Sequence, residues 1–121
     1  MSKTNAKQEL LRDLGNDIIK CAFINNDNYY NEIDNEGFTK YILNCNYTED
    51  EYSKFIESLD FEYDSGYGGQ ELFGNVYLLN GTKLQRGEYD GSEWWEDGAV
   101  SDNEKQLDTM NMDWFIDKIK D

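Results

Sequence analysis

The sequence has no histidine and no proline, and only two of its 121 residues are cysteines. Histidine is the commonest general base near neutral pH, so its absence excludes the Ser-His-Asp and Cys-His arrangements that activate a catalytic nucleophile. Cys21 and Cys45 are far apart in the sequence, and without histidine they cannot complete the ligand set of a structural zinc site. Catalysis would have to rest on carboxylates, tyrosine or lysine. We predict a protein that is not an enzyme and that uses no cofactor and no metal.

Long apolar stretches are also missing from the chain. No run approaches the roughly 18 apolar residues of a membrane-spanning helix, and the opening MSKTNAKQELL lacks the apolar core of a signal peptide. We expect a soluble protein in the cytoplasm. In that reducing compartment Cys21 and Cys45, which stand among apolar residues, are expected to be buried free thiols, and a disulfide between paired strands is the alternative.

Basic residues are scarce, and this shortage restricts the class of partner. Lysine and arginine together number 11 against 26 acidic residues, which gives a net charge of −15. Nucleic acids and anionic membranes would repel such a chain, because both carry dense negative charge. We therefore expect no direct contact with nucleic acid or membrane, and we expect the partners to be basic surfaces or cations.

The chain does contain enough apolar and aromatic residues for one core. Apolar residues make up 38% of the sequence and aromatic residues 15%, which argues for folding despite the charge. The length suits a single domain over residues 1–121, and the sequence contains no repeat, low-complexity tract or obvious linker that would divide it.

The first half of the sequence alternates helix and strand patterns. Residues 4–14 are predicted to form a helix that ends at Gly15, and residues 17–24 and 38–44 are predicted strands that pair as a wide hairpin. Thr48 and Glu51 have the spacing of a capping box, and apolar residues at helical spacing follow them. A second helix is therefore predicted to begin at Thr48.

From Phe61 onward the apolar residues recur with a period of two, which is typical of strands. Strands are predicted over 72–79, 84–89 and 92–96, joined by type I′ turns at Asn80-Gly81 and Asp90-Gly91. A C-terminal helix is predicted between Met112 and Ile119. The expected fold class is α+β, with a small antiparallel sheet (the N-terminal hairpin plus a three-stranded meander) packed with two or three helices.

The acidic residues are concentrated in two segments. Residues 49–71 hold eight acids and one base, and residues 88–104 hold seven acids and no base. If the second helix packs on the meander, these acids can merge into one negative surface that attracts a basic groove from a distance. The alternative is a solubilising shell, in which the acids only face water.

The spacing of some acids suits imitation of nucleic-acid charge. Strand residues two apart, such as Glu62 and Asp64 or Glu88 and Asp90, lie on one face and roughly 6.6 Å from each other. Phosphates along one DNA strand are about 3.4 Å apart, so carboxylates on a rigid sheet can reproduce a phosphate row at half its density. The sequence therefore favours a mimic of nucleic-acid charge over a random acidic coat.

The run RGEYDGSEWWE at 86–96 combines charged residues with two tryptophans. Adjacent strand residues point to opposite faces, so one tryptophan is expected in the core and the other at the surface. Arg86 is expected to pair across the hairpin with Glu93 or Glu96. The residues expected to serve the structure itself are Arg86, Tyr89 and Gly91. The residues expected to bind a partner are Glu62, Asp64, Glu88, Asp90, Glu93, Trp94, Trp95, Glu96 and Asp97. A purely structural role for the whole cluster is the alternative, because aromatic residues on strands usually pack in the core.

Two strings of the sequence, FEYDSGYGGQELFG at 61–74 and RGEYDGSEWWE at 86–96, resemble a family of small acidic proteins of tailed phages and prophages. The resemblance extends from about Tyr47 to Glu96. It implies a phage context and no particular mechanism. The chain departs from the family at one turn, which reads Asn80-Gly81-Thr82-Lys83 where relatives often have Asp-Gly-Thr-Trp, and it lacks the proline-containing ending of many relatives.

These observations lead to one hypothesis and two alternatives. The hypothesis is a phage-encoded acidic inhibitor, acting in the host cytoplasm, that binds and occludes a basic nucleic-acid-handling host protein such as a defence nuclease or its complex. The first alternative is a phage structural or assembly protein that self-associates into a homo-oligomer through the tryptophan cluster. The second alternative is a carbohydrate- or cation-binding module.

Overall fold

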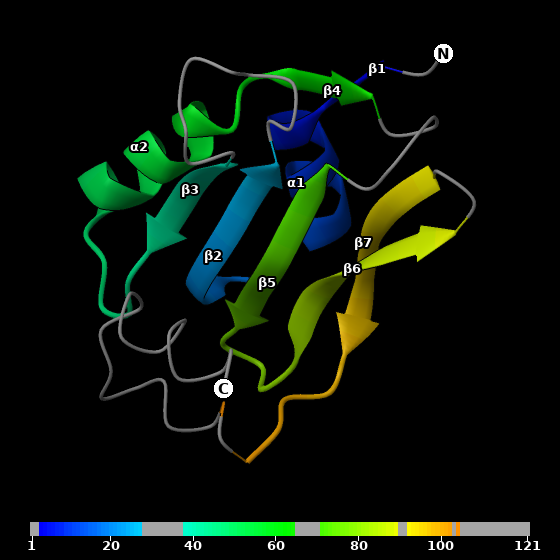
Figure 1. The fold of residues 1–121 in the computed structure, drawn as a ribbon. Helices are drawn as coiled ribbons and strands as arrows, with labels where there is room; N and C mark the ends of the chain where they lie inside the picture. The colour runs from blue at the N-terminus through cyan, green and yellow to red at the C-terminus, as the bar shows by residue number, and fades with distance from the viewer. Residues whose placement is uncertain (1–2, 28–37, 65–70, 90–91, 103, 105–121) are drawn as a thin grey trace.

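The computed structural model describes residues 3–27, 38–64, 71–89, 92–102 and 104 (Figure 1). Two helices and seven strands occur in these ranges. Their order along the chain is β1 (Lys3–Asn5), α1 (Ala6–Leu14), β2 (Ile19–Asp27), β3 (Phe38–Leu43), α2 (Glu49–Ser58), β4 (Glu62–Asp64), β5 (Leu72–Leu78), β6 (Lys83–Tyr89) and β7 (Ser92–Gly98).

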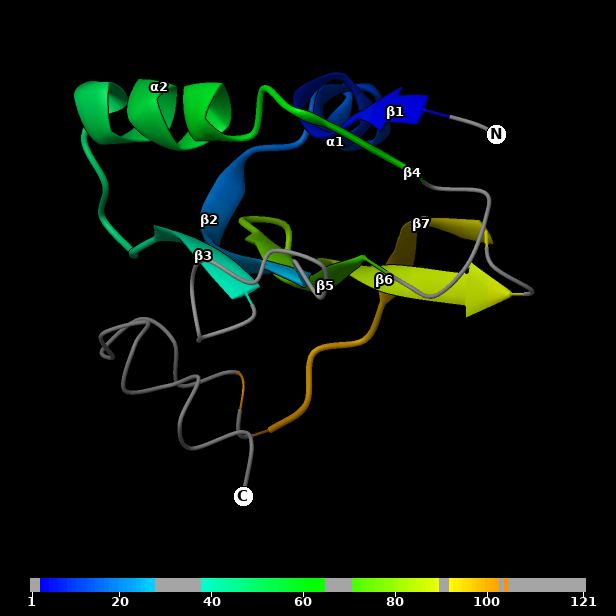
Figure 2. The same ribbon diagram turned by 45° about the horizontal axis from the view of Figure 1, so that its top comes forward.

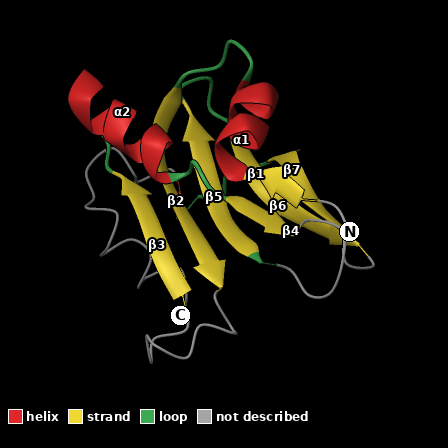
Figure 3. Cartoon of the chain, turned by 90° about the horizontal axis from the view of Figure 1, so that it is seen from above, coloured by secondary structure: helices red, strands yellow, loops and turns green. Residues whose placement is uncertain are grey.

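Five of the strands form one antiparallel sheet with the order β3-β2-β5-β6-β7 (Figure 3). The predicted N-terminal hairpin (β2 and β3) and the predicted meander (β5 to β7) are both present, and the pairing of β2 with β5 joins them. Strands β1 and β4 pair separately as a two-stranded sheet that the sequence pattern did not predict. The α+β class with a small antiparallel sheet is therefore confirmed.

The helices cover one face of the large sheet. Figure 2 shows α1, α2, β1 and β4 on one side, while the chain after β7 leaves on the other. Helix α1 contacts β7 and α2, and α2 packs mainly against β3, at the opposite edge of the sheet. Because α2 packs mainly on β3 and not mainly on the meander, the acids of α2 and of β7 lie toward opposite edges of the sheet.

The main core lies between this face and the helices. Leu10 and Leu14 from α1 and Phe55 and Ile56 from α2 meet buried strand residues such as Val76. A smaller cluster on the opposite face contains Cys21, Phe23 and Tyr77. Both cysteines are free in the structure, as the sequence predicted, but only Cys21 is buried, and Cys45 is partly exposed.

Helix α2 begins as predicted from its capping box. The backbone N–H of Glu51 donates to Thr48 Oγ1, and the backbone N–H of Thr48 donates to the Glu51 carboxylate, both at 3.1 Å. Helix α1 begins two residues later than expected, because Asn5 ends β1 and its side chain caps the helix by accepting from the backbone N–H of Gln8 at 3.0 Å. The predicted stop at Gly15 is confirmed, with φ of 57° there.

The turn between β5 and β6 differs from the predicted type I′ turn. That turn needs positive φ at both Asn80 and Gly81, but only Gly81 has it, at 94°. The backbone N–H of Gly81 donates to Leu78 O at 3.2 Å, and the Asn80 carboxamide oxygen accepts from the backbone N–H of Thr82 at 2.9 Å. The Asn80 side chain therefore builds a wider turn, in which Asn80 itself keeps a negative φ.

Two sequence-based predictions, the turn at Asp90-Gly91 and the C-terminal helix, lie outside the described residues. Among the residues that are described, the longest helix has 10 residues, and none is long and apolar enough to cross a membrane.

Candidate functional site

The two strings that carry the phage resemblance meet around Arg86. This side chain is 2% exposed and lies between two carboxylates, Glu9 from α1 and Glu93 from β7. Its Nη1 donates to Glu9 Oε1 at 3.0 Å and its Nη2 donates to Glu93 Oε1 at 2.7 Å. The predicted pairing of Arg86 with Glu93 is thus confirmed, and Glu9 is a partner that sequence spacing could not reveal.

Aromatic residues complete the surroundings of Arg86. Its guanidinium carbon lies 4.7 Å from the centre of the Trp95 ring and 5.7 Å from that of Tyr63. The Tyr63 hydroxyl accepts from Arg86 Nη2 at 2.9 Å and donates to Glu9 Oε1 at 2.5 Å. Burial, together with the hydrogen bond to Glu9, raises the pKa of Tyr63 well above its usual range, so this hydroxyl stays protonated.

Glu93 also holds backbone groups. Its carboxylate accepts from the backbone N–H of Glu71 at 2.7 Å and from that of Leu72 at 2.9 Å, just where β5 begins. With Arg86 as its third donor, the carboxylate has no exposed surface. Glu93 was expected to bind a partner, but in this position it fixes the sheet and offers nothing to a partner surface.

The two tryptophans are separated as predicted. Trp94 is 36% exposed on one face of β7, whereas Trp95 on the other face is 6% exposed and belongs to the main core. Trp95 was expected to bind a partner, but this burial makes it a core residue instead. The Trp94 indole covers Gly87, where an added Cβ would lie 2.6 Å from Trp94 Nε1. A glycine on β6 therefore makes room for the ring that lies across it.

Other predicted partner-binding residues are at the surface. Those exposed in the structure are Glu62, Glu88, Glu96 and Asp97. Tyr89, expected to be structural, is 76% exposed. Asp64 is opposite Lys3 in the β1–β4 pair, and Asp90 and Gly91 lie outside the described residues. The exposed acids do not form one row, since Glu88 and Glu96 lie on opposite faces of the β6–β7 hairpin.

A second buried ion pair lies on the opposite side of the sheet from the helices. Glu104 accepts from Lys83 Nζ at 2.9 Å and from the Tyr77 hydroxyl at 2.5 Å, and it also accepts from the backbone N–H of Ser101. Burial alone would raise the pKa of Glu104, but the hydrogen bonds from Tyr77, Ser101 and Lys83 lower it to about 2. This carboxylate ties the chain beyond β7 to the sheet.

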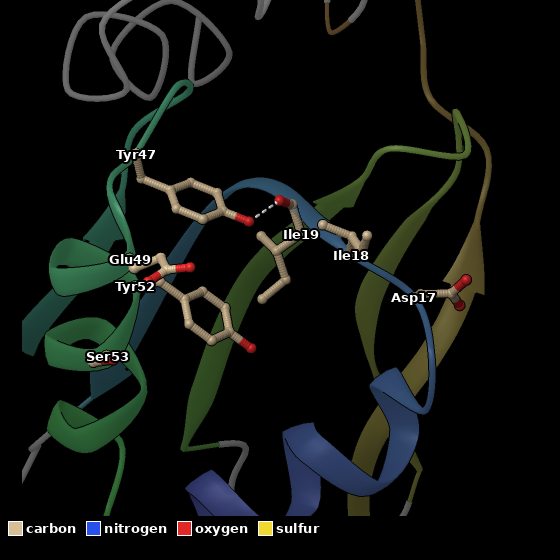
Figure 4. Close-up of a pocket in the computed structure, with 7 residues that line it drawn as sticks. All are labelled: Asp17, Ile18, Ile19, Tyr47, Glu49, Tyr52 and Ser53. Atoms are coloured by element: carbon tan, nitrogen blue, oxygen red, sulfur yellow. Dashed lines mark hydrogen bonds between the residues drawn. The ribbon is translucent and has the colours of Figure 1, made fainter.

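A pocket of about 420 Å³, which the sequence did not predict, lies between the start of α2 and the segment that leads into β2 (Figure 4). Its lining residues are Asp17, Ile18, Ile19, Tyr47, Glu49, Tyr52 and Ser53. The Tyr47 and Tyr52 rings stack with their centres 5.7 Å apart, and the Tyr47 hydroxyl donates to Ile19 O. The pocket thus combines an aromatic wall with two carboxylates.

Comparison of the chain with protein-family models, with curated proteins and with solved structures finds no match. Within the described ranges, no group of three or more acidic or cysteine side chains is arranged to hold a metal ion.

Proposed function

We propose that the protein is an acidic, non-catalytic inhibitor that binds a basic nucleic-acid-handling protein of a phage host and occludes its nucleic-acid site. The observation that carries the proposal is which charged side chains are buried and which are exposed in the described structure. Arg86 and Lys83 are buried against carboxylates. Since these two cations are matched by the buried acids Glu9, Glu93 and Glu104, most other acids of the described residues are exposed at the surface.

The exposed acids are held on rigid elements, which favours binding. Glu96 and Asp97 project from β7, which pairs with β6 along its length, and the neighbouring Glu93 is fixed by three hydrogen bonds. Carboxylates on an ordered backbone lose little entropy when a basic surface binds them. They also speed the encounter with such a surface by long-range attraction.

The aromatic side chain beside these acids supplies an anchor. Trp94 shares its face of β7 with Glu96, and its indole is partly exposed over Gly87. Partly exposed tryptophans surrounded by charge are frequent centres of binding energy at protein interfaces. The β6–β7 hairpin, with Trp94 and its flanking acids, is therefore the proposed contact surface.

The proposed function is tested by capture from host lysate on the immobilised protein. The capture is repeated at low salt, at high salt and with excess duplex DNA. A basic nucleic-acid-binding protein that is captured at low salt and released by both salt and DNA supports the proposal. Capture of no such protein contradicts it.

A pair of matched variants locates the contact surface. Neutralising Glu96 and Asp97 together (Glu96→Gln, Asp97→Asn) is expected to weaken capture. Neutralising Glu57 and Glu62 (Glu57→Gln, Glu62→Gln), which lie outside both the hairpin and the start of α2, removes the same charge elsewhere and is expected to weaken it less. Equal effects of the two variants would mean that net charge alone acts, and the hairpin assignment would then be wrong. The variants leave Glu93 unchanged, because removal of its carboxylate would disturb the fold.

Self-association is the second candidate function, and one observation favours it. Phe73, Tyr89 and Trp94 are large apolar side chains with exposed fractions of 40%, 76% and 36%. Exposed aromatic groups of this kind are typical of protein interfaces. Sedimentation of the purified protein separates the two functions, since an assembly protein is expected to form oligomers and an inhibitor of this type need not.

A further inference from the structure

We propose that the pocket between α2 and the start of β2 binds the side chain of an arginine presented by a basic partner. The proposal rests on the function proposed above, because that function supplies a basic partner. It adds a defined contact for one partner side chain, at a place remote from the β6–β7 hairpin.

The aromatic wall suits a guanidinium group. Tyr47 and Tyr52 stack at an angle of 25°, and both rings border the cavity (Figure 4). Tyr47 is held in place by the hydrogen bond from its hydroxyl to Ile19 O. A planar guanidinium stacks on aromatic faces and is attracted by their π-electrons, and rings that are already fixed add no ordering cost.

The charges around the pocket are negative, which favours binding of a positively charged arginine. The seven described lining residues include Asp17 and Glu49 and no lysine or arginine. Glu49 opens the first turn of α2, which also carries Asp50 and Glu51. The N-terminus of a helix has roughly half a positive charge, and these three acids outweigh it. The local field therefore favours a cation.

Exposed apolar side chains next to the pocket suit the aliphatic part of an arginine and its neighbours. Ile18 is 59% exposed and Leu79 is 62% exposed. The two residues are adjacent, because the backbone N–H of Leu79 donates to Ile18 O at 2.9 Å. Apolar contact at the rim together with aromatic rings and nearby carboxylates is the combination that a long amphipathic cationic side chain matches.

The test is an NMR titration of the full chain with blocked arginine (N-acetyl-arginine methylamide). Blocked citrulline serves as the control ligand, since it keeps the shape and loses the charge. We expect saturable shifts of the Ile18, Ile19, Tyr47 and Tyr52 amide signals with arginine, and affinity for citrulline at least about tenfold lower. Equal binding of both ligands, or shifts confined to other residues, would overturn the proposal.

Charge variants complete the test. Glu49→Gln and Asp17→Asn should each lower the affinity for blocked arginine by about two- to fivefold, the range expected for one exposed charge pair. Glu62→Gln removes an acid on β4 that does not line the pocket and should leave the affinity unchanged. An affinity that falls equally in all three variants would overturn the site. Because no partner protein is used, failure here leaves the lysate result intact, and the reverse also holds.

Discussion

The Glu93 carboxylate on β7 accepts a hydrogen bond from the backbone N–H of Leu72 at 2.9 Å, although β6 lies between β7 and β5 in the sheet. The pairing of β5 with β6 covers Asn75 to Tyr77 and stops short of Leu72. Glu93 thus supplies the acceptor for the start of β5, and Arg86 neutralises the carboxylate that does so.

Removal of the Glu93 carboxylate should strongly destabilise the fold. Glu93→Ala leaves the buried Arg86 with one carboxylate fewer and two backbone N–H groups without their acceptor. We expect a loss of about 3–5 kcal/mol in the free energy of unfolding, measured by urea denaturation. The exposed Glu96→Ala on the same strand should change it by less than about 0.5 kcal/mol. Similar losses in both variants would contradict the role given to Glu93.

Substitution by alanine should destabilise the protein to different extents at two glycines of the sheet. A Cβ at Gly74 would lie 2.1 Å from the backbone oxygen of Phe23, and φ there is 135°. A Cβ at Gly87 would meet the movable indole of Trp94 instead. We expect Gly74→Ala to cost about 3 kcal/mol or more and Gly87→Ala about 1 kcal/mol.

Tryptophan fluorescence checks the reason for the smaller cost at Gly87. In Gly87→Ala the Trp94 ring should swing into solvent and shift the emission to longer wavelength, while the folded structure persists. An unchanged spectrum, or a cost at Gly87 as large as that at Gly74, would show that Trp94 does not cover this position in the way described.

Acid should weaken the attachment of the chain beyond β7. The pKa of Glu104 is about 2 in the folded state against an ordinary value of 4.5, so ionised Glu104 stabilises the folded state. That contribution is complete above about pH 4.5 and is lost as the pH falls through 2. The stability of the wild type should therefore fall over this window.

The variant Glu104→Gln isolates this effect. It should be less stable than the wild type at neutral pH, and the difference between the two should shrink as the pH is lowered from 4.5 toward 2. Thermal unfolding at a series of pH values measures both curves. If the difference in stability between the wild type and Glu104→Gln did not depend on pH, this would argue against the ion pair with Lys83.

Added salt should stabilise the protein. A net charge of −15 repels itself in the folded state, and salt screens this repulsion between exposed groups far more than it screens the buried pairs of Arg86 and Lys83. We expect the melting temperature to rise between low and physiological salt. A variant with Glu62, Glu88, Glu96 and Asp97 neutralised should show a smaller rise, and an equal rise would mean that specific ion binding is responsible.

Sequence patterns predicted the local features of this fold well. The capping box of Thr48 and Glu51 and the separation of Trp94 from Trp95 depend on residues close together in the chain. The turn at Asn80 was predicted wrongly, because the side chain of Asn80 offers the backbone a hydrogen bond that competes with positive φ.

Contacts between residues that are far apart in the sequence could not be predicted from sequence patterns. Glu9 meets Arg86 across 77 positions, and no spacing rule connects them. Glu93 illustrates the same difficulty, since an acid next to two tryptophans in a charged run looked exposed. The tyrosine pocket was missed because its two sides come from residues 17–19 and 47–53, which are brought together only in the folded chain.

The partnership of Glu9 with Arg86 also determines when the domain can finish folding during its synthesis. A ribosome releases α1 long before it has translated Arg86, and until then Glu9 has no cation to accompany it into the core. Burial of a lone carboxylate is costly, so we expect stable docking of α1 only after β6, which carries Arg86, has emerged.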